Sequence, residues 1–206
     1  MLIKTLPVGP LQVNCSIVVC EETRQAVVID PGDDAGEILR EVKQADSEIK
    51  LIINTHGHFD HIGGNAGLIA ASGAELMMHA DDVPVLQQAA VHAGIYGLSV
   101  TPSPDPDRLL ADGESVTIGS LTFSVLHVPG HSPGGICLLI ENDIFVGDCL
   151  FAGSIGRTDL PGGNHDLLIS GIRQKLLPLA DDTVVHPGHG PDTTIGRERE
   201  HNPFLR

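Results

Sequence analysis

The sequence of 206 residues contains no tryptophan, one tyrosine and five phenylalanines, so aromatic residues make up only 3% of the chain. Its core must therefore be built from Val, Ile, Leu and Ala, the residues favoured in sheets that are covered on both faces. Hydrophobic residues make up 41% and charged residues 19%, which is typical of a folded domain rather than a disordered chain. A chain of this length fits one large domain better than two, and we expect a single domain over residues 1–206.

Basic residues are also scarce. Twelve Lys and Arg stand against 27 Asp and Glu, which gives a formal net charge of -15 with His neutral. A surface this acidic repels phosphate backbones and anionic lipid headgroups unless a local basic patch intervenes. The nearest approach to such a patch, residues 197–200, interleaves Arg with Glu. We therefore expect neither nucleic acid nor a membrane as a partner, and the oligomeric state is left open.

Long apolar runs and paired cysteines are missing as well. No uncharged apolar run reaches the length of about 20 residues that spans a membrane. Residues 1–10 contain Lys4 and Pro7 and lack the apolar segment of a secretory signal. No Cys-x-x-Cys pair occurs, and the cysteines lie in apolar segments, which predicts buried thiols rather than ligands or disulfides. These cysteines are Cys15, Cys20, Cys137 and Cys149. Together these features predict a cytoplasmic protein.

The apolar pattern predicts strands and helices in alternation. Runs of β-branched and apolar residues predict strands at 13–19, 26–29, 49–53, 74–78, 115–118, 121–128, 136–140, 144–146 and 183–185. Helical spacing predicts helices at 35–44, 62–73, 80–93 and 166–176, with a short helix at the end of the chain. The proline-rich residues 101–106 and the glycine-rich residues 153–163 are expected to be loops. This composition and order favour sheets and helices packed in layers.

Histidine is concentrated in one segment. His56, His58 and His61 fall within six residues together with Asp60, directly after the strand predicted at 49–53. Side chains two apart in an extended segment point the same way, so His56 and His58 can reach one ion. Asp60 is predicted to be the N-cap of the following helix, and this turn would aim Asp60 and His61 at a second position. The segment therefore predicts two metal ions close together.

Three further candidates stand in glycine-rich turns at or just beyond the ends of predicted strands. They are His131 in Pro129-Gly130-His131, Asp148 in Gly147-Asp148 and His189 in Gly188-His189-Gly190. Active residues concentrate in such loops because the scaffold fixes the loop while glycine lets backbone and ligand approach closely. The combined set of five His and two Asp suits Zn²⁺ and also tolerates Fe or Mn.

The order of these motifs resembles the metallo-β-lactamase superfamily over residues 54–190. His-x-His-x-Asp-His after a strand is followed by Pro-Gly-His, Gly-Asp and a late Gly-His. The resemblance implies an α/β (α+β) fold of four αββα layers, with two facing mixed sheets flanked by helices. It also implies two divalent metal ions, with Asp148 bridging both. The implied ligands are His56, His58 and His131 for the first metal, and Asp60, His61 and His189 for the second.

Within that superfamily, the chain is similar to the short glyoxalase II-like, or hydroxyacylglutathione hydrolase-like, hydrolases. The similarity lies in residues 153–159, in residues 162–165 and in the ending 202–206. It implies hydrolysis of a small thioester such as S-lactoylglutathione to a hydroxy acid and a thiol, by a hydroxide that bridges the two metals. Asp60 is the candidate for orienting that hydroxide and receiving its proton. The chain ends where the glutathione-binding helices of the longer enzymes would begin, so glutathione specificity is left open.

Other reactions would use the same residues. Persulfide dioxygenases are similar in the loop Gly156-Arg157-Thr158-Asp159 and would need one Fe(II), held by His56, His131 and Asp148. A lactone or phosphodiester hydrolase would use the same two metals, because a fold fixes the nucleophile more firmly than the substrate. Arg157 is predicted either to bind a substrate carboxylate or to form an ion pair with Asp159.

The remaining histidines receive structural interpretations. His165 is expected to start a helix that Asn164 caps, and His186 to brace the loop that carries His189. The others have no matching partner in the sequence and are interpreted as structural, namely His79, His92, His127 and His201.

Overall fold

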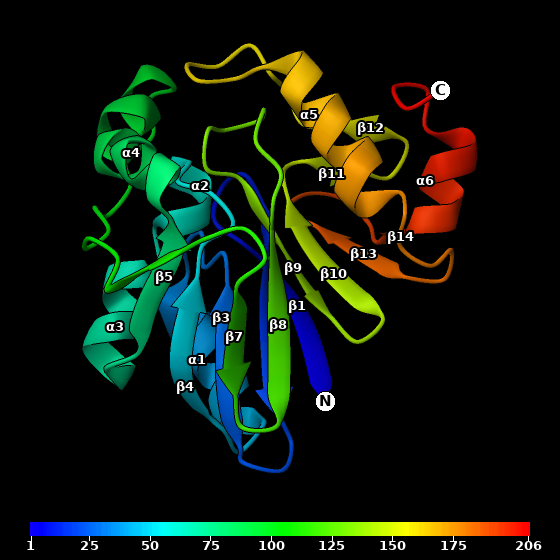
Figure 1. The fold of residues 1–206 in the computed structure, drawn as a ribbon. Helices are drawn as coiled ribbons and strands as arrows, with labels where there is room; N and C mark the ends of the chain where they lie inside the picture. The colour runs from blue at the N-terminus through cyan, green and yellow to red at the C-terminus, as the bar shows by residue number, and fades with distance from the viewer.

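Two six-stranded sheets face each other in the computed structural model, which describes residues 1–206 (Figure 1). The first sheet has the order β1 (Leu2–Val8), β2 (Val13–Cys20), β3 (Gln25–Ile29), β4 (Glu48–Ile53), β5 (Glu75–His79) and β6 (Arg108–Leu110). The second has the order β14 (Thr193–Thr194), β13 (Val184–Pro187), β10 (Asp143–Gly147), β9 (Ile136–Ile140), β8 (Leu121–His127) and β7 (Ser115–Ile118). A small hairpin joins β11 (Leu150–Phe151) to β12 (Ser154–Ile155).

Both sheets are mixed. In the first, β1, β2 and β3 pair antiparallel, whereas β3, β4, β5 and β6 pair parallel. In the second, only β10 and β13 pair parallel. Parallel neighbours need a crossover connection, and helices supply it. The expected mixed sheets are confirmed.

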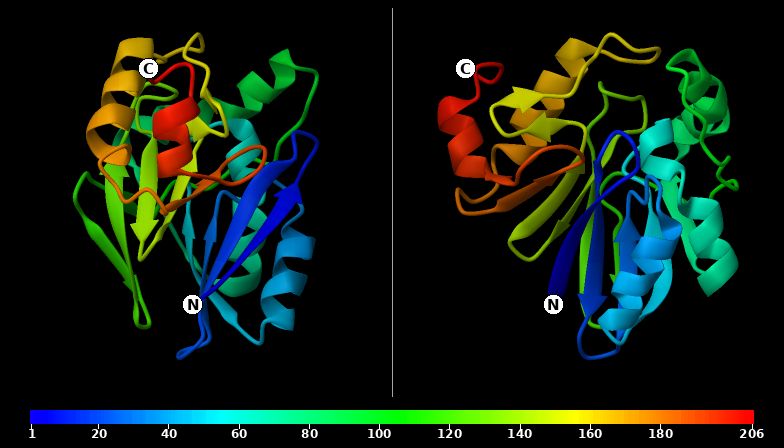
Figure 2. Two further views of the ribbon diagram at one scale, coloured as in Figure 1. Left: turned by 90° about the vertical axis from the view of Figure 1, so that its right-hand side faces the viewer. Right: turned by 180° about the vertical axis from the view of Figure 1, so that it is seen from behind.

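Helices cover the outer face of each sheet (Figure 2). On the first sheet these are α1 (Ala35–Gln44) and α3 (Asn65–Ser72), with α2 (Phe59–Ile62) and α4 (Val83–Ile95) near β5. On the second sheet they are α5 (His165–Gly171), its continuation as a π turn at Ile172–Leu176, and α6 (Ile195–His201). A 3₁₀ turn at Ala80–Asp82 precedes α4. The four αββα layers are therefore confirmed.

Alternation along the strands creates the apolar layers between these elements. In β3, Val27 and Ile29 belong to the cluster between the sheets, whereas Ala26 and Val28 belong to the cluster under α1 and α3. Phe123 is fully buried between the sheets, and without tryptophan the rest of that cluster is mostly aliphatic. Full burial of one such side chain contributes about 1.5–3 kcal/mol.

Most predicted elements are confirmed, and the misses have local causes. The strand β1 was not predicted because it lies at a sheet edge, where Lys4 and Pro7 are tolerated. The prediction that Asp60 is an N-cap is wrong, because α2 begins at Phe59 and His58 is the cap residue. Asp60 instead lies in the first turn, where its negative charge suits the helix dipole.

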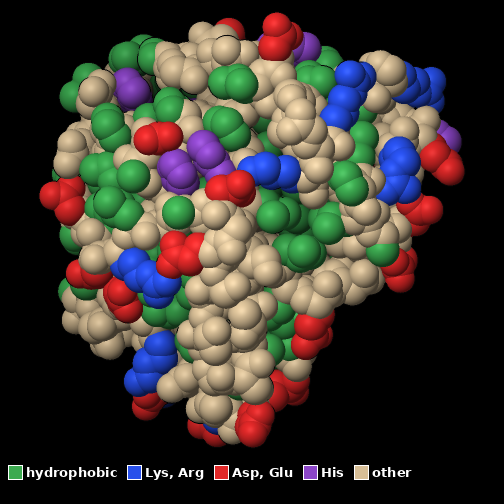
Figure 3. All heavy atoms as spheres, viewed as in Figure 1, with side chains coloured by type: hydrophobic (Ala, Val, Ile, Leu, Met, Phe, Trp, Pro, Cys, Tyr) green, Lys and Arg blue, Asp and Glu red, His purple; other side chains and the backbone are tan.

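The structure also describes the helix lengths, the surface charges and the cysteines. No helix is long and apolar enough to cross a membrane. Acidic and basic side chains are interspersed on the face shown in Figure 3. All four cysteines are free thiols and buried, as predicted.

Candidate metal centre

The seven candidate ligands meet at one edge of the molecule, where four strands end. His56 and His58 follow β4, His131 follows β8, Asp148 follows β10, and His189 follows β13. The donor atoms form two compact sets, each with its atoms within 4.8 Å of one another. The first donor group is His56, His58 and His131, and the second donor group is Asp60, His61 and His189. The structure thus brings together every residue that the sequence pattern selected.

In the first donor group, hydrogen bonds orient the rings of His56 and His131. The Nδ1–H of His131 donates to the carbonyl oxygen of Arg157 over 2.8 Å, which leaves the lone pair of Nε2 directed toward His58 Nδ1. The Thr55 hydroxyl donates to Asp30 Oδ2 over 2.6 Å, so it can only accept from the Nδ1–H of His56, 3.1 Å away. His56 Nε2 is therefore free, in the manner of histidines whose second nitrogen is fixed by a hydrogen bond.

The ring nitrogens of the first donor group lie close together. His58 Nδ1 lies 2.9 Å from His131 Nε2. Two nitrogens bound tetrahedrally to one zinc ion at about 2.0–2.1 Å stand about 3.3 Å apart, so the observed spacing is close to a shared ligand position. His56 and His58 meet edge to face with ring centroids 4.7 Å apart. Three imidazoles aimed at one point fit a cation.

The second donor group contains a carboxylate as well as histidines. His189 Nε2 lies 3.1 Å from Asp60 Oδ2, and His61 Nε2 lies 3.7 Å from the same oxygen. On its other side, His61 Nδ1 faces Asp30 Oδ2 at 3.0 Å. Neither nitrogen of the buried His61 ring has a hydrogen-bond partner, although carboxylate oxygens face both sides of the ring.

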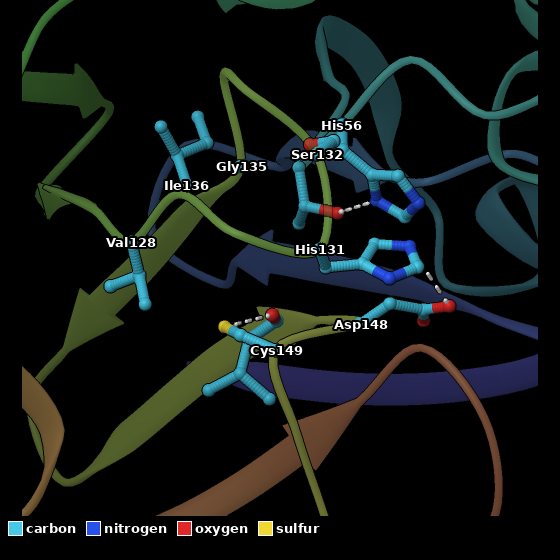
Figure 4. Close-up of a pocket in the computed structure, with 10 residues that line it drawn as sticks. His56, Val128, His131, Ser132, Gly135, Ile136, Asp148 and Cys149 are labelled. Carbon is cyan, nitrogen blue, oxygen red and sulfur yellow. Dashed lines mark hydrogen bonds and ion pairs between the residues drawn. The ribbon is translucent and has the colours of Figure 1, made fainter. Parts of the chain in front are cut away.

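Asp148 stands between the two donor groups. Its Oδ1 lies 3.5 Å from His61 Nε2, and its Oδ2 lies 3.7 Å from His131 Nε2 and 3.8 Å from His189 Nε2. Figure 4 shows its carboxylate beside the rings of His56 and His131. One carboxylate thus reaches both groups, which is the placement that a bridging ligand needs.

Several of these donors are buried without a hydrogen-bond partner. His56 Nε2, His61 Nε2 and Asp148 Oδ1 are in this state, and orphaned buried polar atoms are rare and demand an explanation. The surrounding backbone approaches closely: a Cβ at Gly188 would lie 2.3 Å from Asp148 Oδ1, so only glycine fits there. The donor set and its packing fit two divalent cations.

The charges in the centre agree with this fit. Burial and the neighbouring histidines hold the pKa of His56 well below its usual range, so the ring is neutral and able to ligate. Burial alone would raise the pKa of Asp148, but His61, His131 and His189 hold it below its usual range. Burial opposes protonation of His61, yet Asp148, Asp60 and Asp30 raise its pKa. Cations in place of that proton would balance the same carboxylates.

Asp30 is a functional residue that the sequence reasoning missed. It is only 2% exposed and accepts the backbone N–H of Thr55 over 2.7 Å and the Thr55 hydroxyl over 2.6 Å. Its Oδ2 also faces His61. Asp30 therefore supports His56 through Thr55, and its carboxylate lies within 4.8 Å of the donor atoms of His56 and His61. The only signal in the sequence was an aspartate directly after a strand, in Asp-Pro-Gly.

Arg157 forms the ion pair that was one of its two predicted roles. Its Nε and Nη2 donate to the two carboxylate oxygens of Asp159, each over 2.8 Å, and this pairing raises the pKa of the guanidinium. Binding of a substrate carboxylate by Arg157 stays a prediction. No pattern in the sequence indicated that the carbonyl oxygen of Arg157 accepts a hydrogen bond from His131 Nδ1.

The remaining histidines have different surroundings. Asn164 caps α5 by accepting from the backbone N–H of Leu167, as predicted for the turn before His165. His186 is braced between Asp143 and Asp192, as expected for a residue that supports the loop of His189. His92, which is interpreted as structural, lines a cavity beside the metal centre, and its role stays a prediction.

That cavity has a volume of about 430 Å³. Its floor includes His58, Asp60, His131 and Asp148, and its walls come from the β1–β2 loop, the end of α4 and residues 157–161. A cavity of this size beside convergent polar groups is the usual form of a small-molecule site.

Comparison with protein-family models matches residues 8–189 to the metallo-beta-lactamase superfamily. The chain belongs to this superfamily. Hydroxyacylglutathione hydrolase GloC of Haemophilus influenzae is 40% identical, and the alignment covers 100% of this chain and 98% of that protein.

Solved structures agree with this assignment to the metallo-β-lactamase superfamily. BLEG-1 B3 metallo-beta-lactamase has a TM-score of 0.93 and 41% identity, with 99% of both chains covered. TTHA1623 in a di-iron-bound form has a TM-score of 0.91 and 40% identity, covering 98% of this chain and 100% of that one. ETHE1 from Myxococcus xanthus has a TM-score of 0.83 and 29% identity, covering 98% and 84%. The similarity therefore extends over nearly the whole chain.

Proposed function

We propose that this chain is a binuclear metallohydrolase of the glyoxalase II kind that cleaves a small thioester such as S-lactoylglutathione. The observation that carries the proposal is the pair of donor groups that share Asp148 at the floor of a cavity. The similarity to a hydroxyacylglutathione hydrolase over the full chain supports the thioester as substrate. Zn²⁺ is the proposed metal, and Fe or Mn also suits these donors. We further propose a cytoplasmic location and a small-molecule thioester, rather than nucleic acid or a membrane, as the partner.

Two divalent cations in this centre would lower the pKa of a coordinated water from about 15.7 toward 7 and polarise a substrate carbonyl. The chain's own groups have separate tasks. Asp60 is partly exposed to the cavity and ionised, since His61 and a hydrogen bond from His189 hold its pKa low against the effect of burial. It can therefore accept a hydrogen bond from the attacking water, orient it and receive its proton.

The leaving group requires little help from the protein. A thiol has a pKa of about 8.5, so a thiolate leaves readily near neutral pH. This matches a centre in which the nearest carboxyl groups are ionised and no separate acid stands at the cavity floor. An alcohol or amine leaving group would need a proton donor more strongly.

The test is hydrolysis of S-lactoylglutathione by protein loaded with Zn²⁺, repeated after chelation and in the variants His56→Ala and Asp148→Ala. Activity should disappear on chelation and in both variants, and it should persist in the control His201→Ala, whose side chain is exposed on α6. Full activity in chelated protein or in the two variants would remove the proposal.

A mononuclear iron enzyme that oxidises a persulfide is the second candidate. His56, His131 and Asp148 line one small pocket together, as that reaction would require (Figure 4). A structure of TTHA1623, 40% identical, is described as di-iron-bound, so iron belongs among the metals to test. One iron per chain, with oxygen uptake on glutathione persulfide and no thioesterase activity, would favour this candidate.

The same assay panel should contain a lactone, a phosphodiester and a β-lactam. The first two follow from the shared metal chemistry, and the third from the similarity to BLEG-1. The thioesterase proposal expects the thioester to be cleaved with the highest kcat/KM among them.

A further inference from the structure

The cavity beside the metal centre has a wall made mostly of apolar side chains. These are Phe59 on α2, Ile95 at the end of α4, Leu98, Leu11 of the β1–β2 loop and Leu160, and the ring of Tyr96 adds to them. Ile95 is 75% exposed and Tyr96 55%, which is unusual for large apolar side chains. A contiguous apolar wall open to solvent is typical of a ligand-binding surface.

The one basic side chain that lines this cavity is already paired. Arg157 is the only Lys or Arg among the lining residues, and its guanidinium is held by both oxygens of Asp159. A ligand carboxylate would have to displace Asp159 to gain the same two hydrogen bonds.

We propose that this wall binds an apolar acyl chain, and that the preferred substrates are thioesters with an uncharged apolar acyl group rather than glutathione esters of small hydroxy acids. The inference rests on the proposed thioesterase activity and specifies its substrate class. The acyl carbonyl lies over the metal centre while the chain extends along Phe59 and Ile95. No charged group of the ligand is needed for binding.

The test is a series of acetyl, butanoyl and hexanoyl thioesters of N-acetylcysteamine, which is an uncharged thiol, compared with S-lactoylglutathione. Each CH₂ that becomes buried should raise kcat/KM by about fourfold, the equivalent of about 0.8 kcal/mol. Ile95→Ser should flatten the series. Val91→Ser is the matched control, because Val91 is exposed on the same helix but does not line the cavity, and it should leave the series unchanged.

The outcomes separate the two claims. A series without dependence on chain length, or a preference for S-lactoylglutathione over hexanoyl thioester, would overturn this inference and leave the thioesterase proposal standing. Failure to hydrolyse any thioester with metal bound would overturn the proposed function and this inference with it.

A second, independent observation concerns Asp82, which ends the 3₁₀ turn before α4 and is fully buried. Its Oδ2 accepts the backbone N–H of Gly57 over 2.7 Å, and its Oδ1 accepts the backbone N–H of Gly134 over 2.5 Å. Gly57 separates His56 from His58, and Gly134 lies in the loop of His131. One carboxylate therefore connects the two loops that supply the whole first donor group.

The two loops pack closely against the backbone of Asp82. A Cβ at Gly57 would lie 2.7 Å from the carbonyl oxygen of Asp82, and a Cβ at Gly134 would lie 2.6 Å from its backbone nitrogen. Only glycine therefore fits at these two positions without a shift of the turn that contains Asp82. Hydrogen bonds to a buried carboxylate are short and strong. We infer that Asp82 is a positioning residue that sets the spacing of the first donor group.

The test compares Asp82→Asn and Asp82→Ala with the control Asp81→Asn, a neighbour whose side chain is 60% exposed. Zinc affinity, measured by competition with a chelator, should fall by about 10- to 100-fold in Asp82→Ala. It should fall less in Asp82→Asn, which keeps one acceptor oxygen and serves if the alanine variant does not fold. The absorption spectrum of the Co²⁺-substituted protein should change in the same order. Unchanged zinc affinity and spectrum in Asp82→Asn, with only a lower Tm, would overturn the inference.

Discussion

The two donor groups differ in their surroundings. The first consists of histidines alone, and the partners that orient His56 and His131 are a hydroxyl and a carbonyl oxygen. The second contains Asp60, and Asp30 lies behind His61. Exposure differs in part, since His56 is 2% and His131 6% exposed, whereas the side chain of His189 is 30% exposed. The first group contains no carboxylate, and the second contains Asp60, which lines the cavity.

Both groups border the cavity, through His58 and His131 of the first and Asp60 of the second. Of these three, only Asp60 is a carboxylate that can accept a hydrogen bond from an attacking water. Asp148 is the one ligand common to both, so it offers the most direct way to disrupt both groups at once.

The largest effect is expected for Asp148→Ala. Loss of this carboxylate removes a donor from both groups and leaves the histidines without their charge partner, so activity should fall by more than about 100-fold. Metal content and thioester hydrolysis measured on the same preparation test this. A variant that retains both metals and its activity would show that Asp148 does not link the groups.

The next largest effects are expected for His56→Ala and His189→Ala, which separate the two groups. Each should lower metal content to one ion per chain, because each removes a donor from only one group. We expect the loss of affinity to be greater for His56→Ala, since its side chain is buried and a solvent molecule replaces it less easily. Equal loss of both ions in either variant would contradict independent groups.

Asp30→Asn should have an intermediate effect. The amide keeps the size of the side chain but loses the charge that faces His61 and one of the acceptor oxygens used by Thr55. Loss of such an orienting partner typically costs 10- to 100-fold in metal affinity. A competition titration measures it, and an unchanged affinity would mean that Asp30 only supports the loop.

The smallest effect is expected for Arg157→Ala. The ion pair with Asp159 is exposed on both sides, and exposed pairs contribute about 0–1 kcal/mol. The variant should keep its Tm and its kcat on acyl thioesters of N-acetylcysteamine. A large increase in KM confined to S-lactoylglutathione would instead establish Arg157 as a carboxylate-binding residue.

The sequence indicated the candidate ligands more clearly than the residues that support them. The ligands His56 to His61 stand in a dense motif, and His131, Asp148 and His189 follow recognisable strands. The supports lie far from the ligand segments in sequence: Asp30 and Asp82 each act across 25 positions and bind backbone N–H groups. A backbone donor is present at nearly every residue, so no side-chain pattern reveals such a contact.

Among the strands, too, some are easier to predict from the sequence than others. Buried strands such as β4 have apolar runs that identify them, whereas the edge strand β1 alternates weakly and contains a proline. The apolar wall around Ile95 was not predicted either. It is assembled from segments far apart in the chain, and its residues follow no common periodicity.

The central claim is that two ions share Asp148, and a metal titration tests it most directly. Apo protein titrated with Zn²⁺, followed by desalting and elemental analysis, should retain two ions per chain in the unaltered protein and one in His189→Ala. Retention of a single ion by the unaltered protein, with no further loss in His189→Ala, would contradict the account.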